Sequence, residues 1–190
     1  MKRPVTLLAI VFALATAVEA RPNNAGVIWR IDPAKSEVRF TVTKFGFDDV
    51  TGVFRESEGQ IHYDAADPAA RHIRWRVRVA SVLTDASNRD QALQSSDYFD
   101  SGRHPYLTFE SRAVTVRPDR SLDVAGDITI RGVTKRITVH VTPRVSADSI
   151  SFETDFALNR YDYGVIGGTV LGRLIGREVR VHLMAVGVAS

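Results

Sequence analysis

Side chains that could bind a metal are few and scattered in this sequence of 190 residues. Its histidines are His62, His72, His104, His140 and His182. No two of them have the HxH or HExxH spacing that directs two imidazoles to one zinc ion. The chain also contains no cysteine. We therefore expect surface histidines, no metal site, no disulfide and no cysteine nucleophile.

Two carboxylates and a histidine lie near one another in the sequence, at Asp97, Asp100 and His104. General acid–base catalysis needs two such groups held around one substrate atom. Carboxylates in this position more simply accept backbone N–H groups at a helix start or turn, and we interpret the cluster as capping. Because a GxSxG nucleophile motif is also missing, we predict no catalytic residue.

Lys44 is a charged residue that falls in the apolar phase of its predicted strand. Counting by twos from Val38 gives Phe40, Val42 and then Lys44. A lysine on an apolar face is costly unless its ammonium reaches water or a partner. We expect Lys44 at the rim of an apolar interior, facing water or a ligand head group. The alternative is that the strand ends or bulges before it.

Most of the chain alternates between apolar and polar residues, which is the period of a half-buried β-strand. The clearest case is 73–79, where Ile73, Trp75, Val77 and Val79 share one face and three arginines share the other. Gly52 and Gly59 indicate bends or bulges. The predicted strands are 37–43, 50–54, 59–63, 73–79, 106–116, 122–130, 136–142, 150–158 and 178–186.

The stretch 87–100 breaks this period and contains good helix formers. We predict one short helix or two, with a Ser87 or Asn88 cap. Leu93, Tyr98 and Phe99 would be its inward anchors. No long amphipathic helix is available to cover the apolar strand faces, so the sheet must pack on itself as a sandwich or a closed barrel. A barrel of about eight strands holds only side chains or one small ligand.

Residues 1–20 have the pattern of a secretory signal peptide, with two early positive charges, an apolar run from Val5 to Val18 and a small residue at Ala20. An uncleaved anchor helix is the alternative, but the run is short for a membrane span. The rest of the chain, 21–190, has the length of one domain. We expect the mature protein to begin at Arg21.

The net charge of +3 is nearly balanced and gives little reason to expect a nucleic-acid partner. A basic stripe is present at Arg71, Arg74, Arg76 and Arg78. A nucleic-acid site would need interleaved exposed aromatic residues and a stronger charge. We interpret the stripe as the solvent face of a strand, with a phosphate-binding patch as the alternative.

Several short motifs, in this order along the chain, resemble the YceI-like family of secreted polyisoprenoid-binding proteins. They are Trp-Arg-Ile-Asp-Pro at 29–33, Ser-Glu-Val-Arg-Phe-Thr-Val at 36–42, Val-Thr-Gly-Val-Phe at 50–54, Ser-Val-Leu-Thr at 81–84, Asn-Arg-Asp at 88–90, Ser-Asp-Tyr-Phe-Asp at 96–100, His-Pro-Tyr-Leu-Thr-Phe-Glu-Ser at 104–111, Gly-Asp-Ile-Thr-Ile-Arg-Gly-Val-Thr-Lys at 126–135 and Arg-Tyr-Asp-Tyr-Gly at 160–164. Each motif is weak alone, whereas the ordered set is specific.

The resemblance implies an all-β fold, a lipocalin-like eight-stranded antiparallel β-barrel with a short helical insertion, in the bacterial periplasm. Its apolar pore would hold an isoprenoid-tailed amphiphile, either a polyprenyl lipid or a quinone, with no other cofactor. Two departures are visible. The family often has histidine where Lys44 stands, and its Asp-Phe-Gly pattern is Asp162-Tyr-Gly here.

The strand phases predict which side chains would line such a pore. The predicted ligand-binding residues are Phe40, Val42, Lys44, Phe54, Trp75, Val77, Phe109, Ile128, Phe152 and Phe156. For Trp75 the alternative is a position in the packed core below the ligand. Apart from Lys44, this set offers almost no directional polar contact.

We predict non-catalytic binding, transport or storage of the lipid. One alternative is a small periplasmic enzyme acting on a lipid or quinone, for which Lys44, Tyr63 and Asp97 are the candidate inward polar groups. Another is a structural or interaction barrel filled by its own side chains. A transient contact with a membrane surface and a homodimer are both left open.

Overall fold

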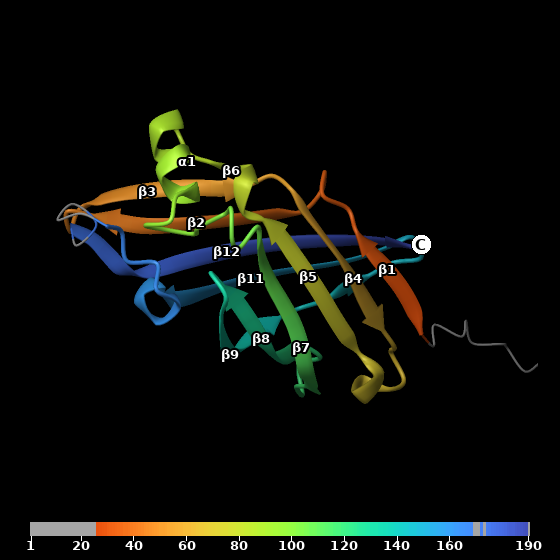
Figure 1. Ribbon diagram of the computed structural model, residues 1–190. Coiled ribbons are helices and arrows are strands. Elements are labelled where there is room, and N and C mark those ends of the chain that lie inside the picture. Colours follow the sequence, from red (N-terminus) through yellow and green to blue (C-terminus); the bar gives the residue numbers. More distant parts are fainter. Residues whose placement is uncertain (1–25, 169–171, 173, 190) are drawn as a thin grey trace, which may run out of the picture.

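The computed structural model describes residues 26–168, 172 and 174–189 (Figure 1). The predicted signal peptide, residues 1–20, lies outside the described residues, so its cleavage stays a prediction. Within the described part of the chain, no helix is long and apolar enough to cross a membrane.

Antiparallel strands make up most of the structure, as the alternation predicts. In the described residues they are β1 (Val27–Ile31), β2 (Glu37–Lys44), β3 (Asp48–Phe54), β4 (Ser57–Tyr63), β5 (His72–Arg78), β6 (Val82–Leu83), β7 (Tyr106–Val116), β8 (Leu122–Ile130), β9 (Val133–Val141), β10 (Arg144–Val145), β11 (Ser149–Asn159) and β12 (Ile175–Ala189). All of them belong to one sheet.

Three longer, bent strands are each divided into two consecutive halves, which are β1 and β2, β3 and β4, and β5 and β6. β1 and β2 both pair with β12, β4 pairs with β1, and β3 pairs with β2. In the same way β5 pairs with β4 and β6 with β3. Counting each pair once, and β10 as a short segment that pairs with β11, the described chain has eight antiparallel strands. The predicted fold class is confirmed.

The sheet curls around one interior (Figure 1). It is therefore a barrel and not the sandwich that the sequence pattern also allowed. Its two ends are β9 and β11, which lie near each other. Among the described residues no ladder of hydrogen bonds joins these two strands. The barrel is therefore open between β9 and β11, unlike a sheet closed by hydrogen bonds all the way round.

The predicted helical insertion is one helix, α1 (Ser87–Gln94), followed by turns up to Asp100. The predicted Ser87 or Asn88 cap is wrong, because Ala86 is the N-cap and contributes no side-chain hydrogen bond. The carboxylate of Asp90 instead accepts hydrogen bonds from the backbone N–H and hydroxyl of Thr84, at 2.8 and 2.6 Å. These bonds tie the first turn of α1 to the chain after β6.

The inward anchors of the insertion are confirmed. Leu93 and Phe99 pack against the main hydrophobic cluster, and Tyr98 and Phe99 pack against a second cluster around Tyr163. Three short 3-10 helices complete the described structure, at Pro68–Ala70, Val79–Ser81 and Arg160–Tyr163. The second of them takes Val79 out of the predicted strand.

Of the bends or bulges predicted at Gly52 and Gly59, the bulges are wrong, because the β3 and β4 ladders keep their register through both glycines. Both residues instead allow close packing. A Cβ at Gly59 would lie 2.3 Å from the carbonyl oxygen of Arg74 on the neighbouring strand. The irregular registers occur between Ser111 and Ala113 in β7 and between Ile175 and Val179 in β12.

β5 illustrates how alternation builds the two faces of the wall. Ile73, Trp75 and Val77 are buried, and the arginines between them are exposed. Each arginine pairs with a glutamate across the sheet surface: Arg74 with Glu110, Arg76 with Glu58 and Arg78 with Glu56. The basic stripe is therefore a charge-balanced solvent face, and the phosphate-binding alternative loses its support.

Candidate functional site

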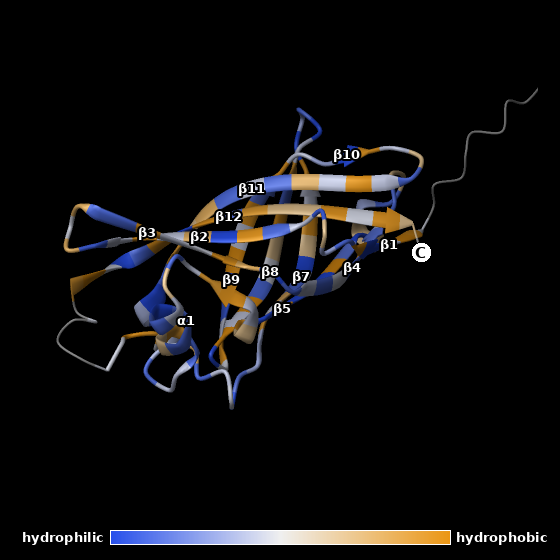
Figure 2. Cartoon of the chain, turned by 90° about the horizontal axis from the view of Figure 1, so that it is seen from above, coloured by the Kyte–Doolittle hydropathy of each residue, from blue (hydrophilic) through white to orange (hydrophobic). Residues whose placement is uncertain are grey.

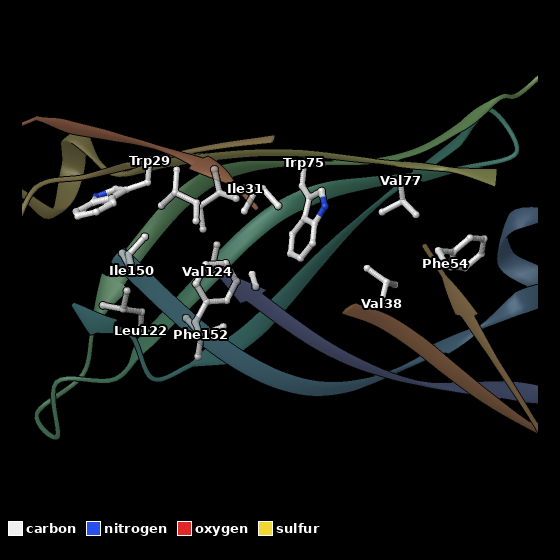
Figure 3. Packing of buried hydrophobic residues seen from close by; sticks show 14 of the residues in the cluster. Trp29, Ile31, Val38, Phe54, Trp75, Val77, Leu122, Val124, Ile150 and Phe152 are labelled. Carbon is white, nitrogen blue, oxygen red and sulfur yellow. The ribbon is translucent and has the colours of Figure 1, made fainter. Parts of the chain in front are cut away.

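The barrel is filled at one end and hollow at the other. Around Trp29, Ile61 and Ile150 the side chains pack into a closed core, in which Trp29 is 4% exposed and Ile150 1% (Figure 3). Toward α1 and the β2–β3 hairpin the walls instead enclose a cavity of about 660 Å³. This volume lies in the range of sites for small molecules, so the alternative of a completely filled barrel is wrong.

All ten residues predicted from strand phase line this cavity. Phe54, Trp75, Val77 and Phe152 are buried, whereas Phe40, Val42, Lys44, Phe109, Ile128 and Phe156 are half-buried because they face the hollow. Trp75 thus belongs to the cavity wall as well as to the core. Contact of these residues with a ligand stays a prediction.

Three aromatic rings form a connected series from the wall to the helical insertion. The Phe40 and Phe54 centroids are 5.6 Å apart, and Phe54 meets Phe99 edge-on at 5.9 Å. Aromatic pairs at these distances are favourable contacts. The insertion is therefore packed onto the wall, and it covers part of the cavity with residues that strand alternation could not identify: Ala86, Asn88, Arg89, Ala92, Leu93, Tyr98 and Phe99.

Lys44 is the last residue of β2 and pairs with Ile175 on one side and Asp48 on the other. It lines the cavity, so the strand does continue to it. Its ammonium lies 4.6 Å from the centre of the Phe45 ring, a cation–π distance. Among the described carboxylates none is within 4.0 Å of this ammonium.

Arg160 is a buried cation at the same end of the barrel, and sequence reasoning missed it as a site residue. The residue is 6% exposed and lines the cavity. It donates to five backbone carbonyls, those of Val165, Ile166, Gly172, Ile175 and Gly176, at 2.6 to 2.9 Å. These bonds use all five N–H donors of the guanidinium.

Burial lowers the pKa of Arg160 from its ordinary value, because desolvation disfavours the charged form. Burial also raises the pKa of the neighbouring Tyr163 hydroxyl. Because the donors of Arg160 are already occupied by carbonyls, the residue positions the loop after β11 and has no N–H left for a ligand head group.

The acid–base cluster does not assemble. Asp100 pairs with Arg103 at 3.7 Å, and the His104 ring lies beside Gly132. The capping interpretation is also wrong, since no described side-chain hydrogen bond joins Asp97 or Asp100 to a backbone N–H. Of the inward polar candidates Lys44, Tyr63 and Asp97, only Lys44 lines the cavity.

Two of the histidines, His62 and His72, are paired across β4 and β5, and His72 Nε2 lies 3.5 Å from the carboxylate of Glu110. His140 contacts Asp123 at 3.1 Å and His182 contacts Asp155 at 2.9 Å, both on the outer surface. In the part of the chain that the structure describes, no group of three or more metal-ligating side chains could hold an ion.

Comparison with known proteins agrees with this architecture. The family model described as "YceI-like domain" matches residues 29–186. A UPF0312 protein of Pseudomonas fluorescens is 31% identical over 170 residues, covering 84% of this chain and 86% of the relative. A UPF0312 protein of Pseudomonas savastanoi pv. phaseolicola is 29% identical over 173 residues, covering 88% and 89%.

Solved structures share the fold. BcnA of Burkholderia cenocepacia superposes with a TM-score of 0.76 at 25% identity, covering 82% of this chain and 98% of BcnA. A polyisoprenoid binding domain from Saccharophagus degradans, implicated in plant cell wall breakdown, gives a TM-score of 0.71 at 18% identity, covering 86% and 99%. The Campylobacter jejuni YCEI protein gives 0.67 at 22% identity, covering 76% and 87%.

Proposed function

The chain belongs to the YceI-like family, and on that premise we propose that it binds an amphiphile with an isoprenoid tail inside the barrel cavity. The observation that carries the proposal is the cavity itself, which is closed at the Trp29 end and lined almost wholly by apolar side chains. The polyisoprenoid binding domain among the structural neighbours supports the same ligand class.

The energetics suit a long apolar tail. Burying each methylene-sized group contributes about 0.8 kcal/mol, so a few isoprene units would supply useful affinity without any directional bond. Phe40, Phe109, Ile128 and Phe156 are half-buried on the hollow side and would become fully buried against such a tail. Discrimination between tails would rest on length and shape, at about 1–3 kcal/mol per methylene.

Transport or storage is the role we propose, in the periplasm after removal of the signal peptide. A lipid carrier must exchange its cargo with a membrane, and four exposed apolar side chains fit such a contact: Phe45, Phe47, Ile166 and Leu174. Phe45 and Leu174 are joined by a backbone hydrogen bond of 2.9 Å. The β2–β3 hairpin, which carries Phe45 and Phe47, and the start of β12, which Leu174 directly precedes, lie at the hollow end (Figures 1 and 2).

The enzyme alternative is the weaker one, because catalysis inside the cavity would need a polar pair around one substrate atom. Of the three polar residues suggested for such a pair, Lys44, Tyr63 and Asp97, only Lys44 lines the cavity.

Mass spectrometry of lipids extracted from the purified native protein tests the proposal. We expect a stoichiometric isoprenoid lipid or quinone in the wild type, and little in a Val42→Trp variant whose added indole occupies the cavity. Circular dichroism would verify that the variant keeps its sheet. Wild-type protein that carries no isoprenoid and does not bind one on addition would refute the function.

A further inference from the structure

Two buried polar groups on the cavity wall have no partner in the protein. Trp75 and Thr154 are each 6% exposed, and both line the cavity. Among the described residues, neither the indole Nε1 of Trp75 nor the Oγ1 of Thr154 has a hydrogen-bond partner. A buried polar group left unpaired is costly, so the pair requires an explanation.

Phe152 connects the two residues. The Trp75 ring meets the Phe152 ring edge-on, with centroids 6.5 Å apart. Thr154 follows Phe152 by two residues on β11 and therefore points to the same side of the sheet. Figure 3 shows Trp75 between the packed core at Trp29 and the hollow end at Phe54, with its nitrogen on the Phe54 side.

The chemistry of the pair selects one kind of ligand group. An indole N–H can only donate, and a threonine hydroxyl can donate or accept. Both atoms are covered by their surroundings in this structure, so a rotation of each side chain would bring them to an oxygen acceptor, which would satisfy both. The acceptor must be uncharged, because Trp75 belongs to a cluster of buried apolar residues that includes Ile73, Val124 and Val141, where an unpaired charge would be strongly disfavoured.

We propose that Trp75 and Thr154 form a polar subsite at the inner end of the cavity, which binds the carbonyl oxygen of a ketone or quinone on an otherwise apolar ligand. This assignment rests on the proposed lipid-binding function and makes it more specific. A neutral carbonyl-bearing ligand would enter with its carbonyl end first. An amphiphile with a charged head would keep that head in water at the rim near Lys44.

The experiment uses two probes of equal shape: farnesylacetone, an isoprenoid methyl ketone, and its hydrocarbon analogue with C=CH2 in place of the carbonyl. Affinities of the folded protein for both probes are measured by calorimetry. We expect the wild type to prefer the ketone by about fivefold for each hydrogen bond formed. Trp75→Phe and Thr154→Val should each reduce that preference, and Thr154→Ser should restore it.

Trp29→Phe is the matched control. Trp29 Nε1 is equally buried and unpartnered, but Trp29 lies in the packed core and does not line the cavity. The variant should keep the preference for the ketone. A carbonyl stretch of bound farnesylacetone that shifts to lower frequency in the wild type, and returns toward its value in hydrocarbon solvent in Trp75→Phe, is the second expected result.

Equal binding of the two probes by the wild type would overturn the subsite and leave the lipid-binding function standing. Binding of neither probe would overturn both. A preference for the ketone that survives in Trp75→Phe and in Thr154→Val would also overturn the subsite, because the carbonyl would then be recognised elsewhere.

Discussion

The ring of Phe40 occupies the space that a side chain at Gly52, its paired residue on β3, would take. A Cβ at position 52 would lie 2.4 Å from the Cζ atom of Phe40. The glycine therefore sets where this aromatic ring rests against the cavity wall.

Gly52→Ala should push the Phe40 ring into the cavity and weaken binding of long isoprenoid tails. Overpacking of this kind costs about 1–3 kcal/mol, and we expect a lower thermal midpoint together with a reduced affinity. Gly102→Ala is the control, because a Cβ there meets no atom within 4 Å. Unchanged binding and stability in Gly52→Ala would show that the ring has free space elsewhere.

Arg160→Met should loosen the chain after β11 without changing the strand ladders. The variant leaves five backbone carbonyls without their donor, and we expect destabilisation of about 3 kcal/mol or more. Hydrogen exchange should accelerate over residues 160–168 more than in β7 or β8. Arg55→Met, at an exposed position away from this segment, should leave exchange there nearly unchanged.

Trp75 fluorescence should report ligand entry. In a Trp29→Phe background Trp75 is the single tryptophan, because the chain has two. Titration with a short-tail isoprenoid quinone should give a saturable change in its emission. Trp75→Ala should destabilise the fold by about 3–5 kcal/mol, since it removes a large buried ring. A flat titration, with binding shown independently by calorimetry, would place the ligand away from Trp75.

Lys44→Met should preserve the fold and change head-group preference. The methionine keeps an apolar stem at the rim and removes the ammonium, whose contribution at this half-exposed position is about 1 kcal/mol or less. We expect up to about fivefold weaker binding of an isoprenoid diphosphate relative to the alcohol with the same tail. If both proteins had the same preference between the diphosphate and the alcohol, Lys44 would have no part in head-group recognition.

Asp127 should contribute to acid sensitivity. Hydrogen bonds from Arg112 and Arg136 lower the pKa of its carboxyl, so the folded state holds this proton less readily than the unfolded state. The resulting stability is present above about pH 4 and is lost as the pH falls through the lowered pKa. Asp127→Asn should therefore narrow the stability difference between pH 7 and pH 3, measured by urea denaturation.

Most of the strands and their inward faces were predictable from the sequence alone, although β1, β6 and β10 were not among the predicted strands. Side chains alternate strictly across a strand, so the parity of residues such as Phe40, Trp75 and Phe152 already fixes which side of the wall each takes. The family resemblance then supplied the barrel in place of the sandwich, and the family match and the structure agree with it. The alternative that the strand ends or bulges before Lys44 is wrong, because β2 runs to that residue.

The hollow end, the packed end and the role of Arg160 were decided only by the tertiary structure. Whether a barrel interior is filled depends on how far side chains from opposite walls reach across it, and no local pattern records that distance. Arg160 lies in a Tyr- and Gly-rich stretch that reads as a turn, and its partners are backbone carbonyls from residues up to sixteen positions away. The positions of Trp75 and Thr154 in their strands are likewise ordinary in the sequence. Only the complete tertiary structure shows that Trp75 Nε1 and Thr154 Oγ1 have no hydrogen-bond partner among the described residues.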